Sequence, residues 1–106
     1  MDVTITSRHL DLTDEMRDYI SGKLQNAVKM FPHVVRSVQV TIEQENYLYM
    51  SEAIADLTVN KTLTATSQDK DMRTGVDTML SKLSEQMRRL KEKVEDHHRH
   101  GRPPRR

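Results

Sequence analysis

Residues 71–94, "DMRTGVDTMLSKLSEQMRRLKEKV", carry the clearest periodic pattern in the chain. Apolar residues recur there at every third or fourth position, the spacing that places side chains on one face of an α-helix. Asp69 and Asp71 come before them, and either carboxylate can accept hydrogen bonds from the free N–H groups of a helix start. The apolar face consists of Met72, Val76, Met79, Leu80, Leu83, Met87, Leu90 and Val94. The pattern predicts a long amphipathic helix that ends before Gly101 and packs on a core.

A second stretch with helical spacing lies nearer the N-terminus. Thr13 offers an N-cap hydroxyl, and Asp14 and Glu15 would complement the positive end of the helix dipole. Its apolar face consists of Met16, Tyr19, Ile20, Leu24, Ala27, Val28 and Phe31. Pro32 cannot continue a helix, so the helix is predicted to end before it.

Apolar residues that recur at every second position predict four β-strands. The strands are expected at residues 2–7, 34–43, 53–59 and around 63–65. Their order with the helices is β-α-β-β-β-α, and each helix has a single apolar face to bury. We therefore predict an α+β fold, a two-layer sandwich in which two helices cover one face of a four-stranded sheet.

Two connections between strands can be assessed from the pattern. Residues 44–50, "QENYLYM", begin with polar side chains and are interpreted as a turn or loop. A three-residue loop after Val59 would pair Val59 with Leu63 and Leu57 with Ala65, which keeps these four residues on one face.

Charge is distributed unevenly along the chain. The formal net charge is +1, but the segment from Lys82 onward has nine basic and four acidic residues. Residues 1–81 have eight basic and twelve acidic residues. A basic segment of this kind favours contact with phosphate backbones or other anionic surfaces. A solvated helix face without a partner explains the same charges, and the sequence leaves both interpretations open.

The basic residues of the last helix are predicted to border its buried face. At about 100° per residue, Lys82, Arg89 and Lys93 fall on one flank with Gln86. Arg88 and Lys91 fall on the other flank, and Glu85 and Glu92 point away from the core. Rows of cations on a rigid helix suit a phosphate track, because each neutralised phosphate releases counterions.

Several classes of function are not expected from this sequence. There is no cysteine and no apolar run near the roughly 20 residues that span a bilayer. No Gly-rich phosphate loop, HExxH or GxSxG motif is present, so we expect a binding module without catalytic residues or a cofactor. His97, His98 and His100 lack further ligands at defined spacing and are expected to bind metal only adventitiously. We expect a cytoplasmic protein.

Aromatic side chains give limited support for base stacking. Tyr47 and Tyr49 lie in or beside the predicted loop and offer rings on which a base can stack. Tyr19 falls on the apolar face of the first helix and is expected to be part of the core.

Two segments carry a resemblance to a known family: residues 5–24, "ITSRHLDLTDEMRDYISGKL", and residues 69–93, "DKDMRTGVDTMLSKLSEQMRRLKEK". They resemble the bacterial ribosome hibernation-promoting factors and ribosome-associated inhibitors, once called sigma-54 modulation proteins. The resemblance covers residues 1–94 with the same order of elements, and it implies a shape similar to that of double-stranded-RNA-binding domains.

The resemblance implies binding to the small ribosomal subunit, in the channel shared by messenger RNA and tRNA. Translation would be blocked there in stressed or stationary cells, through basic side chains that contact 16S ribosomal RNA phosphates. By position, the family's basic sites correspond to Arg8, Arg17, Lys23, Lys82, Arg89, Lys91 and Lys93. Arg88 joins this set because of its place on the helix. We expect a monomer off the ribosome, with no membrane or small-molecule partner.

The chain also departs from the family pattern. The connection between the second and third strands, "EQENYLYMSEA", is acidic where many members are basic, which puts an RNA contact there in doubt. Long members add a dimerisation domain that is not expected in this 106-residue chain, so a short form is favoured. We expect residues 1–95 to form the ribosome-binding domain and residues 96–106 a disordered basic tail.

Two other functions compete with this one. A general binder of structured RNA would use the same basic surface without a ribosome. A protein–protein regulator would need apolar residues left over from the core, and Ile54 and Leu48 are the evident candidates.

Overall fold

The computed structural model describes residues 1–31 and 33–100, without the side chains of residues 94–100. Its elements are β1 (Asp2–Arg8), α1 (Asp14–Val28), β2 (Val35–Glu45), β3 (Leu48–Leu57), β4 (Thr62–Asp69) and α2 (Met72–His100). This is the predicted order of elements. Thr13 caps α1 as expected, since its hydroxyl accepts a hydrogen bond of 3.1 Å from the Met16 N–H.

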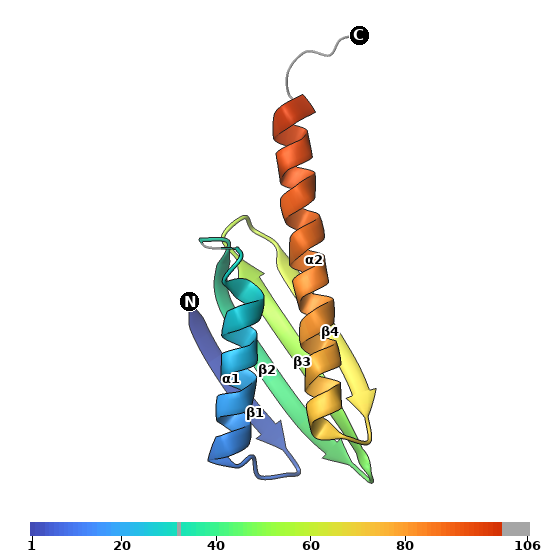
Figure 1. Ribbon diagram of the computed structural model, residues 1–106. Coiled ribbons are helices and arrows are strands. Elements are labelled where there is room, and N and C mark those ends of the chain that lie inside the picture. Colours follow the sequence, from blue (N-terminus) through green and yellow to red (C-terminus); the bar gives the residue numbers. More distant parts are fainter. Residues whose placement is uncertain (32, 101–106) are drawn as a thin grey trace.

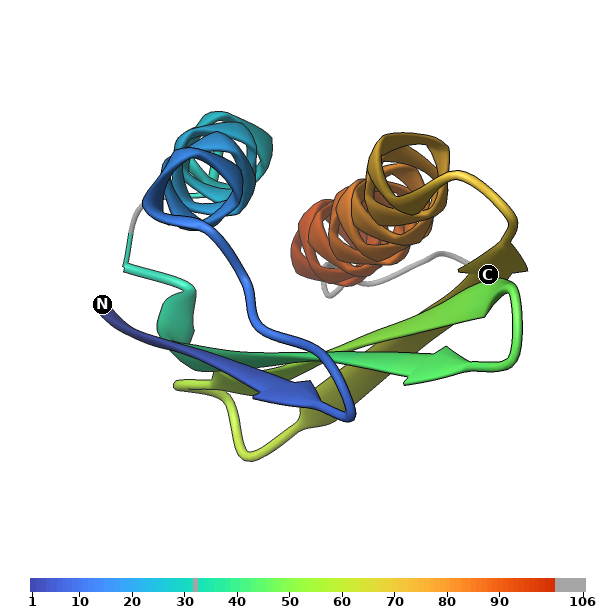
Figure 2. The ribbon, with the colours of Figure 1, turned by 90° about the horizontal axis from the view of Figure 1, so that it is seen from below.

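The four strands form one sheet in the order β1-β2-β3-β4. β1 and β2 are parallel and α1 connects them, whereas β2–β3 and β3–β4 are antiparallel hairpins. Both helices lie on the same face of the sheet, and they run in the same direction (Figures 1 and 2). The predicted two-layer α+β sandwich is confirmed.

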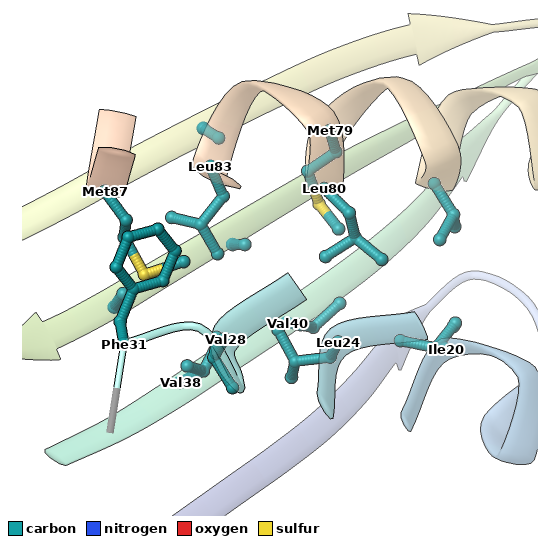
Figure 3. Close-up of a cluster of buried hydrophobic side chains, with 14 of the residues drawn as sticks. Ile20, Leu24, Val28, Phe31, Val38, Val40, Met79, Leu80, Leu83 and Met87 are labelled. Atoms are coloured by element: carbon teal, nitrogen blue, oxygen red, sulfur yellow. The ribbon is translucent and has the colours of Figure 1, made fainter. Parts of the chain in front are cut away.

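The core fills the space between the helices and the inner face of the sheet (Figure 3). Its members are apolar side chains that alternate along the strands and recur every three or four residues along the helices. The fully buried ones with the largest side chains include Ile20, Leu24, Val38, Val40, Ile42, Leu57, Val76, Met79 and Leu83. Burial of each such side chain contributes about 1.5–3 kcal/mol, so these residues hold the two layers together.

The predicted loop at residues 44–50 is wrong. β2 continues to Glu45 and β3 begins at Leu48, so only Asn46 and Tyr47 form the turn. Asn46 has a φ of 58°, a left-handed conformation that asparagine tolerates better than most residues. A tight turn therefore suffices, and the hairpin is longer than its polar sequence indicated.

The predicted register of β3 and β4 is also wrong, although the predicted face is right. Leu63 is paired with Ala55 and Ala65 with Ala53, four positions away from the predicted pairing. The β3–β4 hairpin closes where the Leu57 N–H bonds to the Lys61 carbonyl at 2.9 Å, and the next N–H, that of Thr58, bonds to the Val34 carbonyl on the β2 side at 2.9 Å. Val59 is consequently 54% exposed in a loop.

Helix α2 extends beyond the edge of the sheet at its C-terminal end (Figure 1). Up to Lys93, the last side chain of α2 that the structure describes, Met87 is the last buried residue, and Leu90 packs only partly against the core. The helix continues to His100, so the expected domain boundary at residue 95 falls within it. Residues 101–106 lie outside the described residues, as do the side chains of His97, His98 and His100. Neither the disordered tail nor adventitious metal binding is therefore tested.

Neither helix of the described chain is long and apolar enough to cross a membrane.

Candidate nucleic-acid interface

The two faces of the molecule differ in charge. The sheet face away from the helices, termed the open face, carries mainly hydroxyl, amide and carboxylate side chains. They are Thr4, Thr6, Gln39, Thr41, Glu43, Glu52, Asp56, Thr64, Thr66 and Gln68. Two cations accompany them: Arg8 at the end of β1, and Arg36, which lies 3.4 Å from the Asp56 carboxylate. This face would repel a phosphate backbone more than attract it.

The cations of α2 lie on two sides of the helix, as its sequence predicted. Lys82 is directed to the β4 side, where its Nζ donates to the Thr66 carbonyl at 2.9 Å. Lys91 lies on the side of α1, with its Nζ 5.9 Å from the centre of the Phe31 ring. Lys93 is exposed one turn beyond the last core residues. The helical layer therefore presents positive charge along both flanks of α2.

Two of the predicted RNA-binding residues also protect the edges of the sheet. Lys82 and Gln86 donate to the Thr66 and Thr64 carbonyls of β4, each at 2.9 Å. Arg17 does the same for the opposite edge strand, because its guanidinium donates to the Ile5 carbonyl of β1 at 2.9 Å. Unpaired edge carbonyls invite pairing with another chain, so these contacts have a structural role of their own.

Arg88 and Arg89 belong to a surface network of ion pairs. Arg88 pairs with Glu85 and, at 3.0 Å, with Glu92, while Arg89 lies 3.1 Å from Glu85. Hydrogen bonds from Arg88 lower the pKa of Glu85, and Glu85 in turn raises the pKa of Arg88. All of these side chains are at least 41% exposed, and exposed pairs contribute little to stability. The arginines can therefore exchange a carboxylate for a phosphate at low cost.

Tyr19 lies at the centre of a cluster that joins the two helices. Its hydroxyl donates to Asp77 Oδ1 at 2.7 Å, and this bond raises the pKa of Tyr19. Lys23 Nζ lies 3.7 Å from the same Asp77 oxygen and 5.7 Å from the centre of the Tyr19 ring. The Arg73 guanidinium lies 4.7 Å from that ring, within cation–π range. Tyr19 packs partly against the core, as predicted, but its polar end is a link between α1 and α2.

Sequence reasoning did not single out Arg73. The signal was present, because a spacing of four residues places Arg73 and Asp77 on one side of α2. Arg8, by contrast, was grouped with the helix cations but lies on the open face. Tyr47 is exposed at the β2–β3 turn, at the end of the molecule away from the C-terminal part of α2 (Figure 1). Tyr49 is half-buried opposite Asp69 in β4.

No cluster of histidine and acidic side chains that could hold a metal ion occurs among the residues that the structure describes. The prominent surface feature is the cationic helical layer on a scaffold whose other face is acidic. Fold and surface together define a small two-layer α+β binding module.

The sequence model of the family described as sigma 54 modulation protein / S30EA ribosomal protein matches residues 3–95. The chain belongs to this family. The resemblance inferred from residues 5–24 and 69–93 is thereby confirmed.

Curated relatives carry the name ribosome hibernation promoting factor. The one from Acidithiobacillus ferridurans is 36% identical over 80 residues, which is 73% of this chain and 100% of that protein. The one from Azotobacter vinelandii is 30% identical over 103 residues, which cover 97% of this chain and 94% of that protein. A relative from Rhizobium meliloti is longer, and the 26% identical match covers 52% of it.

Solved structures share the fold. A ribosomal subunit interface protein from Coxiella burnetii has a TM-score of 0.80 at 20% identity, and the match covers 87% of this chain and 99% of that protein's chain. The N-terminal domain of Protein Y from Thermus thermophilus has a TM-score of 0.77 at 22% identity, and the match covers 85% of this chain and 99% of that domain's chain.

Proposed function

We propose that this protein is a ribosome hibernation factor that binds the small ribosomal subunit and blocks translation. It would lie in the channel used by messenger RNA and tRNA, in the cytoplasm of stressed or stationary cells. The family and the names of the curated relatives support a role in ribosome hibernation. The charge of the two faces supports the mode of binding.

The observation that carries the proposal is the separation of charge between the helical layer and the open face. Cations outnumber acids on the two helices and include Lys23, Arg73, Arg88, Arg89 and Lys91, while carboxylates and hydroxyls cover much of the open face. A phosphate backbone on the helical layer would gain from the release of counterions, and each contact would make binding weaker as salt rises. The open face would then point away from the ribosomal RNA.

The proposed RNA contacts differ in what each cation already does. The full set is Arg8, Arg17, Lys23, Lys82, Arg88, Arg89, Lys91 and Lys93. Arg17 and Lys82 each donate to a strand carbonyl, so they would contribute to RNA binding mainly by their charge. Arg8 lies on the open face and would contact RNA only at the border of the interface. Lys91 and Lys93 lie past Met87, the last buried residue among those of α2 whose side chains are described.

The proposed mechanism is steric and needs no chemical step. A bound domain of this size would occupy space that messenger RNA and tRNA anticodon stems require. Initiation would fail for as long as the domain stays bound, and ribosomes would be preserved in an inactive form.

Co-sedimentation with vacant small subunits at two salt concentrations tests the proposal. Wild-type protein is expected to bind at one copy per subunit, and initiator tRNA with messenger RNA should displace it. The double variant Lys91→Glu/Lys93→Glu should bind at least about tenfold more weakly and with a shallower salt dependence. The matched control Lys61→Glu/Lys70→Glu changes the same charge at two exposed lysines that belong to none of the proposed contacts, and it should bind nearly as wild type.

Three outcomes would contradict the proposal. They are wild-type protein that stays at the top of the gradient at both salts, equal effects of the two double variants, and equally tight binding to plain duplex RNA. The last would indicate a general binder of structured RNA. A protein–protein regulator has little support, because Ile54 and Leu48 are half-buried on the open face and no large apolar patch surrounds them among the described residues.

A further inference from the structure

A groove of about 320 Å³ runs between α1 and α2, and uncharged polar side chains line much of it. Asn26 lies on the α1 side, and Ser81 and Ser84 lie on the α2 side. A second hollow on the outer surface of α2 shares Asp77 and Ser81 with this groove. The two hollows therefore meet at these two residues.

Cations border this polar strip on both sides. Lys23 lines the groove on the α1 side. Lys82 and Arg89 line the second hollow on the far side of α2. An RNA strand alternates charged phosphates with ribose hydroxyls, so phosphates would meet the cationic borders and riboses the hydroxyl and amide groups between them.

Asp77 is the acid at which the two hollows meet, whereas Glu85, the other acid that lines the second hollow, is paired with Arg88 and Arg89. The Asp77 Oδ1 accepts the Tyr19 hydroxyl at 2.7 Å and lies 3.7 Å from Lys23 Nζ. Its other carboxylate oxygen has no hydrogen-bond partner among the described residues, and the side chain is 44% exposed. An ionised carboxylate only accepts hydrogen bonds. A phosphate has no proton to donate to it, whereas a ribose 2′-hydroxyl does.

We propose that the groove between α1 and α2 binds the ribose edge of an RNA strand, with Asp77 accepting a hydrogen bond from a 2′-hydroxyl. Ser81 and Ser84 contact neighbouring sugars. The groove thus makes the helical layer selective for RNA over DNA, a distinction that cations alone do not provide. The inference deepens the proposed function and rests on its premise that the helical layer faces ribosomal RNA.

The variant Asp77→Ala tests the inference by the sign of its effect. Loss of a negative charge should strengthen binding to any polyanion if charge alone matters. Loss of a hydrogen bond to ribose should instead weaken binding to small subunits by about three- to tenfold. The salt dependence should stay the same, because no counterion release is lost with this contact.

A second measurement uses a labelled RNA stem-loop and a DNA stem-loop of the same sequence. Wild type should prefer the RNA. Asp77→Ala should bind the RNA more weakly and the DNA equally or more tightly, so that the preference falls.

Two matched variants distinguish the effect of the Asp77 carboxylate itself from that of its hydrogen-bond partner and from a general change of charge. Tyr19→Phe keeps the ring and the carboxylate and should keep the preference for RNA. Asp18→Ala removes the same charge from an exposed position of α1 and should leave the preference unchanged. If circular dichroism shows that Asp77→Ala does not fold, Ser81→Ala/Ser84→Ala replaces it, with the same expected loss of preference.

Tighter binding of Asp77→Ala to both probes, or an unchanged preference in the serine double variant, would overturn the inference and leave the proposed function intact. Failure of the wild type to bind small subunits would instead overturn the proposed function.

Discussion

Gly22 occupies a position within α1 where a side chain would meet nothing. No atom lies within 4 Å of a Cβ built at this residue, apart from its immediate surroundings in the helix. Glycine lowers the stability of the helix because it leaves the unfolded backbone more conformational freedom.

Gly22→Ala is therefore expected to raise the free energy of unfolding by about 1 kcal/mol. Urea denaturation followed by circular dichroism measures the change. Binding to small subunits should not change, since residue 22 belongs to none of the proposed contacts. A loss of stability would contradict the open surroundings of residue 22 in α1.

Asp71 caps α2, as its place before the apolar pattern predicted. Its Oδ2 accepts hydrogen bonds from the Thr74 N–H at 3.0 Å and from the Thr74 hydroxyl at 2.6 Å. These bonds hold the pKa of Asp71 below its ordinary value of 3.8. The cap therefore contributes stability above that value, and the contribution is lost as pH falls through the lower folded pKa.

Asp71→Asn is expected to weaken the dependence of thermal stability on pH below about pH 5. Asparagine keeps an acceptor for Thr74 but does not titrate in this range. Thermal melts of the two proteins at matched pH values provide the comparison. An identical slope in both would show that this cap is not linked to protonation.

At the scale of elements, the helices protect both edges of the sheet. Arg17 of α1 covers β1, while Lys82 and Gln86 of α2 cover β4. A helix above a sheet can reach the edge carbonyls only with long side chains that bend around the outer strand. The two edges are thus protected by residues whose sequence pattern indicated only surface charge.

Removal of this protection should promote self-association. Lys82→Ala/Gln86→Ala leaves the Thr64 and Thr66 carbonyls without these donors and is expected to form dimers or larger species at high concentration. Its stability should fall by about 1–2 kcal/mol at most, since each exposed hydrogen bond contributes little. Sedimentation velocity checks the result. Lys82→Arg keeps a donor of sufficient length and should stay monomeric.

At the scale of the whole molecule, the C-terminal part of α2 extends away from the body (Figure 1). The extents of the molecule are 57 × 23 × 19 Å, and α2 runs along its long direction (Figure 1). The core ends at Met87 and Leu90, so the remainder of the helix adds length and charge but no buried apolar surface in the part described.

Deletion of residues 96–106 is expected to leave the free energy of unfolding unchanged within about 0.5 kcal/mol. The deleted segment contains Arg99, Arg102, Arg105 and Arg106, so binding to small subunits should weaken modestly and depend less on salt. Denaturation curves and co-sedimentation at several salt concentrations measure the two effects. An unchanged salt dependence would count against a role for these arginines.

The sequence alone determined the elements, their order and the face that each one buries. These follow from local patterns: the periods of 2 and 3.6 residues and the caps at Thr13 and Asp71. The rotational positions of Lys82 and Lys91 were also predictable, because they depend only on the helix itself.

The tertiary structure alone decided how distant segments meet. The β3–β4 register depends on the hairpin closing between Leu57 and Lys61, and the link between the helices depends on Tyr19 and Asp77, which are 58 residues apart. The same holds for the edge contacts of Arg17 and Lys82 and for the groove beside Ser84. Periodicity describes one element at a time, whereas these contacts depend on the distance and orientation between two elements, which only the packed core fixes.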